Sequence, residues 1–298
     1  MNKIQISNQL VWSRYNKVKY FHQSIKNPSK DTILELGPNL SPVFRKENFK
    51  VSYLETVDKT GLIQRANKKN ISHHLIPEID FIFNADKGML KSLPDNIKFD
   101  YLCSSHVIEH IPNFIQHLID VEFLLNENGE YLIISPDKKY TFDHLRPFTT
   151  VGEFLSRHKS PNDNLSFSSK IDSIFYSTKT LEEKGNWNKK YLDDLNYRHK
   201  NRIDPIKSIM NTKKTDLKPW YGHYSVFTPL SFYEIVSCLN QIGLCNLKIV
   251  DIKCTNNMDF IRILRKSNLN NGKTIKEIKN YLKEVRYFEL TKEVKCNN

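Results

Sequence analysis

The chain has 298 residues, of which 39% are hydrophobic and 26% are charged, and it includes 17 Phe and 14 Tyr. Its net charge of +12 comes mainly from the second half, where residues 151–298 hold 26 Lys and Arg against 16 Asp and Glu. These values exclude a disordered chain and allow one large α/β domain, and the scattered basic residues fit a solvated surface as well as an anionic partner.

The N-terminus has no uninterrupted apolar segment, and no later stretch approaches the roughly 20 apolar residues of a membrane span. The five cysteines are odd in number and form no CxxC pair, which is typical of reduced thiols rather than of a disulfide framework or a zinc site. We therefore expect a cytoplasmic protein without a transmembrane segment.

The first half alternates short apolar runs with helix-like segments, as the βα units of a mostly parallel sheet do. Residues 113–125 place Phe114, Leu118, Val121 and Leu125 three and four positions apart, which predicts an amphipathic crossover helix. Five strands are predicted, over residues 32–36, 50–55, 79–83, 99–104 and 130–135.

The second half begins with a long stretch, 140–225, that is rich in Lys, Asn and Ser and predicts an insertion with a few short helices. Regular structure resumes with a helix over 228–242, which is opened by Thr228-Pro229 and ends before Gly243. The last predicted elements are a strand hairpin over 247–252 and 260–264 and a charged helix over 274–288.

Together these elements predict a doubly wound, Rossmann-like α/β sheet of seven strands, mostly parallel, with a C-terminal antiparallel hairpin and a helical or irregular insertion. The chain is predicted to divide into five parts. They are an N-terminal helical extension (1–31), a Rossmann-like core (32–139), the insertion (140–225), the C-terminal part of the core (226–266) and a helical tail (267–298).

The segment ILELGPNLSP at 33–42 joins the first predicted strand to a sharp turn. Gly37 permits the turn and a close approach of the backbone to a ligand, and Asn39 is of a type that adopts left-handed dihedrals readily. About 20 residues later, Glu55 ends the second strand, where a carboxylate can accept from both hydroxyls of a ribose. Asp58 is the second candidate for that role, and an ordinary glycine-containing turn is the alternative for the whole segment.

Three further segments complete a resemblance to a known family. They are SSHVIEHIPN at 104–113, PDKKYTFDHLRP at 136–147 and HYSVFTPLSF at 223–232. With the ELGP turn and Glu55, they resemble class I S-adenosylmethionine-dependent methyltransferases, and most closely the methyltransferase-domain proteins associated with glycan and polysaccharide biosynthesis. The likeness spans residues 32–264, with a gap through the insertion.

The resemblance implies S-adenosylmethionine as the cofactor and the core as its binding domain. Glu55 would hold the ribose. Relatives have glycine where Asn39 stands and an acid near Asn84, so Asp86 is expected to substitute at the adenine. The implied cofactor-binding residues are Glu35, Gly37, Pro38, Asn39, Glu55, Asn84, Asp86, Ser104, Ser105 and His106.

The insertion is expected to bind the methyl acceptor, because the loop after the fifth strand emerges at the edge of the sheet that holds the cofactor. Asp137 and Asp143 are predicted to accept from sugar hydroxyls, and Arg146 to grip a carboxylate or phosphate. His223 is the preferred general base, since imidazole titrates near neutrality. A structural Asp143–Arg146 ion pair and a simply packed His223 are the alternatives. The predicted residues are His223, Asp143 and Asp137 for catalysis and Lys138, Tyr140 and Arg146 for substrate binding.

The segment HVIEH at 106–110 also fits the H-x-x-E-H pattern of inverted zinc peptidases. Neither a third ligand nor a helical context is evident, and Glu109 and His110 can instead fix the first turn of a helix through hydrogen bonds. We expect no metal.

The expected reaction is O-methylation of a sugar, a nucleotide-sugar or a surface glycan, in association with glycosyltransferases. Nucleic acid is not an expected partner, because the chain has no RNA-binding module signature and no Asn-Pro-Pro-Tyr-like motif. Methylation of RNA or protein is one alternative. A cofactor-binding scaffold without catalysis is another, although the motifs that contain Asp143, Arg146 and His223 argue against it.

Overall fold

The computed structural model describes residues 14–160, 165–180, 195–199, 201–212, 222–255 and 258–266. The predicted tail helix over 274–288 lies outside these residues, as does most of the predicted helical tail. Among the residues described, no helix combines the length and the apolar character that crossing a bilayer requires.

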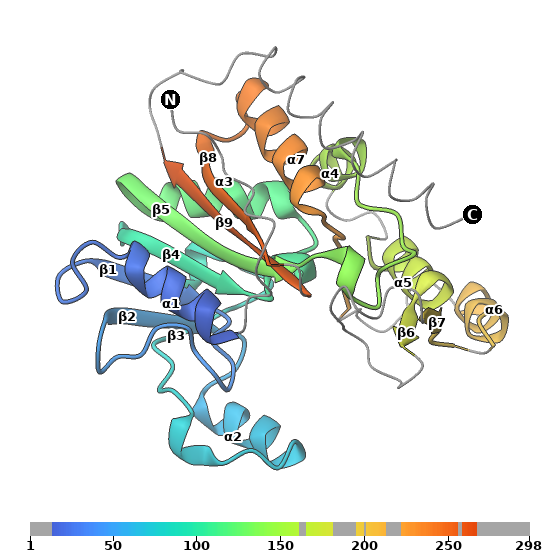
Figure 1. The fold of residues 1–298 in the computed structure, drawn as a ribbon, viewed down its shortest axis with the longest axis horizontal. Helices are drawn as coiled ribbons and strands as arrows, with labels where there is room; N and C mark the ends of the chain where they lie inside the picture. Colours follow the sequence, from blue (N-terminus) through green and yellow to red (C-terminus); the bar gives the residue numbers. More distant parts are fainter. Residues whose placement is uncertain are drawn as a thin grey trace.

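A seven-stranded sheet organises the molecule (Figure 1). Its strand order is β3-β2-β1-β4-β5-β9-β8, with the first five strands parallel and β9 antiparallel to both of its neighbours. The strands are β1 (Thr32–Leu36), β2 (Lys50–Glu55), β3 (Phe81–Ile82), β4 (Phe99–Ser105), β5 (Leu125–Pro136), β8 (Leu247–Cys254) and β9 (Asp259–Lys266). The predicted fold class, including the C-terminal antiparallel hairpin, is confirmed.

Each face of the sheet is covered by helices, which is why the central strands are apolar on both sides. On one face α3 (Phe114–Leu124) and α7 (Pro229–Gln241) pack against a core that includes Leu34 and Leu102. On the other face α1 (Arg14–Ser24) buries Phe21 in a second core. Figure 1 shows α1 in front of the sheet and α3 behind it.

The connection from β1 to β2 contains no helix, unlike the strand-helix-strand unit implied by the spacing of Gly37 and Glu55. Residues 37–49 form a series of turns instead. Pro42 disfavours a helical conformation at the residue before it. The apolar side chains of this loop, Val43 and Phe44, complete the core beneath α1.

Two predicted strand boundaries were wrong. The third strand was expected over 79–83, but β3 spans only Phe81–Ile82, because Asp80 uses its side chain to accept from the backbone of Tyr53 at 2.8 Å. The fifth was expected from residue 130, but β5 begins at Leu125, directly after α3. The predicted helices over 113–125 and 228–242 agree with α3 and α7 to within one residue at each end.

The insertion contains the expected short helices and one element that was not expected, the antiparallel pair of β6 (Thr178–Thr180) and β7 (Leu195–Tyr197). Figure 1 shows this pair beside α5 and α6, beyond the point where the chain leaves β5. The short helix η4 (Lys138–Tyr140) leads into the insertion, whose helices are α4 (Val151–Lys159), α5 (Leu165–Tyr176) and α6 (Ile203–Asn211).

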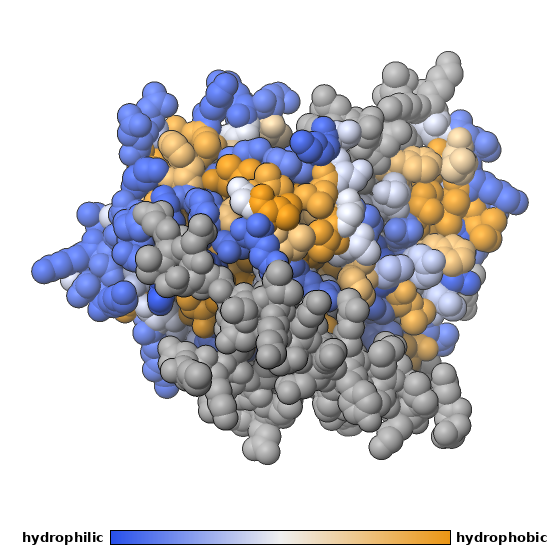
Figure 2. All heavy atoms as spheres, turned by 90° about the horizontal axis from the view of Figure 1, so that it is seen from above, coloured by the Kyte–Doolittle hydropathy of each residue, from blue (hydrophilic) through white to orange (hydrophobic). Residues whose placement is uncertain are grey.

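The surface mixes hydrophilic and hydrophobic patches. Figure 2 shows hydrophobic side chains gathered in the middle of the face seen from above, among hydrophilic ones. Exposed apolar side chains of the described residues include Ile242, directly after α7, and Val250 on the edge strand β8.

Candidate functional site

The strand order reverses between β1 and β4, and the carboxyl ends of these two strands are where open α/β sheets bind ligands. The turn after β1 has two residues in the left-handed region, Gly37 at φ 61° and Asn39 at φ 47°. A Cβ atom on Gly37 would lie 2.8 Å from Cγ2 of Val107, so glycine is required here for space as well as for conformation. Asn39 is exposed and leaves its side chain free to meet a ligand at this edge.

Glu55 ends β2 beside this turn, as predicted. Its Oε2 accepts from the backbone N–H of Asn39 at 3.1 Å, while Oε1 accepts from the N–H of Thr56 at 2.7 Å. Arg65, on α2 (Lys59–Lys68), lies 3.4 Å from Oε1. These contacts hold a buried carboxylate beside the turn that follows β1.

Glu35 lies near the end of β1 and is buried against the loop that follows this strand. Its two carboxylate oxygens accept from the backbone N–H groups of Val43 and Phe44 at 2.7 and 2.9 Å. Burial raises the pKa of Glu35 to about 7, although both N–H groups favour the charged form. The side chain therefore pins the loop that contains Pro38 and Asn39, rather than presenting a free carboxylate.

The three predicted residues at the end of β4 differ in exposure. Ser104 is fully buried, and its hydroxyl is 2.7 Å from the hydroxyl of Tyr131 in the core. Ser105 and His106 are half-buried, and His106 has a left-handed φ of 56°. The chain thus presents Ser105 and His106, rather than Ser104, at the edge of the sheet.

The two residues predicted at the adenine lie just beyond β3. The N–H of Phe83 donates to the carbonyl of Glu55 at 2.7 Å, which brings this segment to the end of β2. Asn84 and Asp86 are exposed, and Oδ1 of Asn84 accepts from the N–H of Asp86 at 3.0 Å. The structure thus brings Asn84, Asp86, Glu55 and the turn after β1 to one edge.

His106 forms a bridge between two buried acids. Its Nε2 lies 3.1 Å from Oδ1 of Asp259, and its Nδ1 lies 3.4 Å from Oε1 of Glu109. Burial acts to lower the pKa of His106, but the closeness and negative charges of both acids outweigh it and raise the pKa to about 10. Lys17 of α1 pairs with Asp259 from the other side. His106 is therefore held as an imidazolium.

Among the residues predicted for the acceptor, His223 and Asp143 form a close pair, with Nδ1 of His223 2.5 Å from Oδ2 of Asp143. Arg146 donates from Nη1 to Oδ1 of Asp143 at 3.4 Å and to the carbonyl of His223 at 2.7 Å. Burial acts to raise the pKa of Asp143, but His223 and Arg146 lower it below its usual range. All three side chains are buried, and Arg146 is engaged in the internal ion pair that was the alternative to anion binding.

The remaining predicted residues surround η4. Asp137 caps this turn, since its Oδ1 accepts from the N–H of Lys139 at 3.1 Å. The N–H of Lys138 donates to the carbonyl of Phe227 at 2.9 Å, and Tyr140 is buried. Lys138 lines a narrow pocket together with Asp143 and His223, so the structure brings part of the predicted acceptor set together.

Sequence reasoning missed Asp259, Lys17 and Arg262. Arg262 is fully buried on β9, with its guanidinium 3.7 and 3.9 Å from the ring centres of Phe260 and Phe232. Burial lowers the pKa of Arg262 well below its usual range. A charged residue within an apolar run marks Arg262 in the sequence, whereas nothing in the sequence pairs Lys17 with Asp259, which is 242 positions away.

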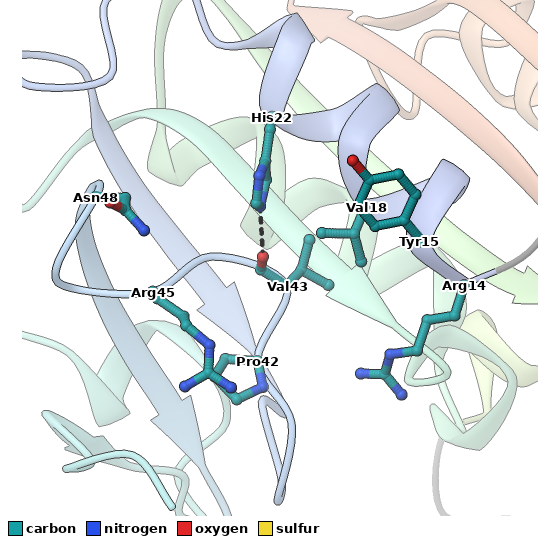
Figure 3. A pocket seen from close by; sticks show the side chains of 8 residues that line it. All are labelled: Arg14, Tyr15, Val18, His22, Pro42, Val43, Arg45 and Asn48. Atoms are coloured by element: carbon teal, nitrogen blue, oxygen red, sulfur yellow. Dashed lines mark hydrogen bonds between the residues drawn. The ribbon is translucent and has the colours of Figure 1, made fainter. Parts of the chain in front are cut away.

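A separate pocket lies between α1 and the loop that follows β1 (Figure 3). Nε2 of His22 donates to the carbonyl of Val43 at 2.7 Å across it. No predicted site residue lines this pocket. Its lining consists of Arg14, Tyr15, Val18, His22, Pro42, Val43, Arg45 and Asn48.

No family model and no curated protein matches the chain. Solved structures do resemble it. They include a SAM-dependent methyltransferase from Aquifex aeolicus, with 9% identity over 84% of this chain and 89% of that one and a TM-score of 0.41. Another is an S-adenosylmethionine-dependent methyltransferase from Clostridium acetobutylicum ATCC 824, with 10% identity over 86% and 93% of the two chains and a TM-score of 0.44. A third is the CcbJ methyltransferase from Streptomyces caelestis, with 9% identity over 84% of this chain and 94% of that one and a TM-score of 0.44. Likeness at this level carries no argument about activity.

The chain's own geometry places two chemically distinct groups of residues at the strand ends. One group surrounds Glu55 and offers a carboxylate beside the left-handed turn after β1. The other surrounds His223 and offers an imidazole oriented by a buried carboxylate. His106 and Glu109 lie between β4 and the His223 segment, since the N–H of Ser225 donates to the carbonyl of Glu109 at 3.1 Å.

Proposed function

We propose that this chain is an S-adenosylmethionine-dependent methyltransferase that binds its cofactor across the carboxyl ends of β1, β2 and β4. The observation that carries the proposal is the contact of Glu55 Oε2 with the N–H of Asn39, at the point where the strand order reverses. It supports the proposal because the carboxylate that would bind the ribose lies directly beside a turn with two left-handed residues.

The residues present fit this cofactor. Glu55 would accept from the ribose hydroxyls, and the turn at Gly37, Pro38 and Asn39 would lie along the methionine end. Ser105 and His106 would close the site after β4. Asn84 and Asp86 would meet the adenine, with Glu35 supporting the loop and Ser104 the strand. When bound, the cofactor supplies a methyl group on a sulfonium.

The proposed acceptor is a sugar, nucleotide-sugar or surface glycan that is methylated on oxygen. The carboxylate of Asp143 is ionised, so Nδ1 of His223 must donate to it, which leaves Nε2 free to take a proton from a hydroxyl. Arg146 orients this pair, and Asp137, Lys138 and Tyr140 would complete the acceptor side. Association with glycosyltransferases and a cytoplasmic location belong to the same proposal.

Calorimetry with S-adenosylmethionine and S-adenosylhomocysteine tests the cofactor. We expect both to bind the purified full-length chain, and folded protein that binds neither would remove the methyltransferase assignment. Mass spectrometry of nucleotide-sugars and glycans incubated with enzyme and cofactor tests the acceptor, with a methyl increment as the expected result. RNA and protein substrates run in parallel distinguish the other acceptor classes.

A further inference from the structure

A group of potential metal ligands shares His223 with the His223–Asp143 pair. One ligand atom from each of Glu109, His110 and His223 lies within 4.8 Å of the other two. Glu109 and His110 come from η3 (Ile108–His110), and His223 comes from the end of the insertion. The rings of His110 and His223 are edge to face, with centres 4.9 Å apart. The set is therefore built from two segments that are distant in the sequence.

Both imidazoles are oriented in the way that metal ligation needs. Nδ1 of His223 donates to Asp143, and Nδ1 of His110 donates to the carbonyl of Gly222 at 3.1 Å. Each bond puts a proton on Nδ1, so the lone pair of the neutral ring lies on Nε2. Histidines that bind metals are usually oriented in this way, by a carboxylate or a backbone carbonyl on the other nitrogen.

Glu109 supplies an independent observation. Its side chain is buried, yet neither carboxylate oxygen has a hydrogen-bond partner among the residues described. The ion-pair contacts of Oε1 are longer, 3.4 Å to Nδ1 of His106 and 4.0 Å to Nε2 of His110. Burying a carboxylate without hydrogen bonds is unfavourable. A cation between Glu109 and the two imidazoles would satisfy it.

We propose that Glu109, His110 and His223 form a binding site for one divalent transition-metal ion of the zinc class. Two imidazoles and one carboxylate suit such ions, whereas magnesium and calcium prefer oxygen ligands alone. Metal–ligand bonds of about 2.0–2.2 Å put the ligand atoms roughly 3.3–3.5 Å apart, so closure on the ion requires shifts of only about 1 Å.

The site differs from the zinc-peptidase pattern considered for residues 106–110. That pattern needs both histidines on one turn of an α-helix, but His106 has a left-handed backbone and lies before η3. Both ring nitrogens of His106 are already engaged, Nε2 by Asp259 at 3.1 Å and Nδ1 by Glu109 at 3.4 Å. His223 replaces it, and Glu109 is a ligand rather than a base.

Three protein ligands leave a coordination position open, as in catalytic zinc sites. Glu109 and His223 line the narrow pocket that also contains Lys138, Thr141 and Asp143. Metal binding itself does not depend on the methyltransferase assignment. A catalytic role for the ion does rest on the proposed function. In that role the ion would hold the acceptor hydroxyl in the open position and increase its acidity. His223 would then be a ligand and not the base, because one lone pair cannot serve both roles.

The test is a zinc titration of the full chain after treatment with a chelator, read by competition with a chromophoric chelator. We expect one zinc ion per chain. Glu109→Gln and His110→Ala should each weaken binding by at least about 100-fold, and Asp143→Asn by about 10–100-fold through the orientation of His223. Magnesium should not compete. The cobalt-loaded protein should show visible absorption that Glu109→Gln abolishes.

His73→Ala is the matched control, because His73 is an exposed histidine of η1 (His73–Leu75) and should leave zinc binding unchanged. Thermal unfolding checks that each variant is folded, and His110→Ala is the safer variant since His110 is exposed. Zinc binding that is absent, or equally strong in wild type, Glu109→Gln and His110→Ala, would overturn the metal site. Calorimetry with S-adenosylmethionine is a separate readout, so either proposal can fail while the other stands.

Discussion

The backbone N–H of Asn39 donates to Oε2 of Glu55 across 3.1 Å, so the turn after β1 and the end of β2 are fixed to each other. Glu55→Gln should therefore weaken S-adenosylmethionine binding by about tenfold or more, since a hydrogen bond to a charged group contributes roughly 1.5–3 kcal/mol. Calorimetry measures the change. Glu47→Gln, in an exposed part of the loop, is the matched control. Equal affinities in the two folded variants would contradict a ribose role for Glu55.

A side chain at Gly37 should destabilise the protein for two reasons, backbone strain and a steric clash, and a comparison with Gly88 separates them. Gly37→Ala should lower the free energy of unfolding by about 1–3 kcal/mol, because φ is positive and the new Cβ would lie 2.8 Å from Val107. Gly88→Ala is the control, since φ is also positive there but the Cβ would meet nothing within 4 Å. Gly88→Ala should lower the free energy of unfolding by less, because only backbone strain acts there.

The clash itself can be relieved. Adding Val107→Ala to Gly37→Ala should recover part of the lost stability, giving a favourable coupling energy in a double-mutant cycle measured by urea unfolding. Cofactor affinity should stay low in the double variant if the backbone at Gly37 approaches the ligand. Simple additivity of the two substitutions would show that Val107 does not limit the space at Gly37.

His117 predicts how stability depends on pH. It is buried on α3 with Nε2 2.9 Å from the hydroxyl of Tyr131, and burial lowers the pKa of His117 from 6.5 to about 4. Between these values the unfolded chain binds a proton that the folded chain does not. This group therefore makes the protein less stable as the pH falls from 6.5 to 4, by on the order of 3 kcal/mol.

His117→Gln removes the titrating group while keeping a polar contact for Tyr131. Urea unfolding at several pH values should give a shallower loss of stability below pH 6.5 in this variant than in wild type. Only the difference between the two proteins is diagnostic, because Asp143 and Asp259 also lose favourable charge interactions in acid. An identical pH slope in the variant and the wild type would rule out a buried neutral His117.

The architecture was predictable because it depends on local signals. Apolar runs locate five of the seven strands closely, and Thr228-Pro229 marks the start of α7, where Thr228 accepts from the N–H of Ser231 at 3.1 Å. The β6–β7 pair was not predictable, since strands of three residues have too little periodicity to stand out.

The candidate site was predictable only in part, because contacts between distant segments leave no local signal in the sequence. The sequence names Glu55, Asp143 and His223, but it does not show which distant segments meet around them. The contact of Lys17 with Asp259 exists because α1 packs on a face of the sheet to which β9 contributes. The burial of Glu109 likewise depends on the His223 segment, whose Ser225 binds the carbonyl of Glu109. No local pattern encodes such neighbours.

The acceptor pair gives the last prediction. His223→Ala should leave S-adenosylmethionine affinity nearly unchanged and lower the single-turnover rate of methyl transfer by about 10²–10⁴, because the proposed role of His223 is on the acceptor and not on the cofactor. Asp143→Asn keeps an oxygen that can accept from Nδ1 but loses the charge that orients the ring. It should lower the rate as well, by a smaller factor.

If His223 only fills space in the core, the result should differ. Removing the buried imidazole would then lower the free energy of unfolding by about 1–3 kcal/mol. The molecules that remain folded would transfer the methyl group at the normal rate. Thermal unfolding, calorimetry and single-turnover kinetics on one preparation of each variant therefore separate the two roles. A stable His223→Ala variant with an unchanged rate would transfer the proton-accepting role to Asp143 or Asp137, the other acids near this loop. A slow variant with wild-type cofactor affinity would assign His223 to the acceptor, as base or as metal ligand according to the zinc titration.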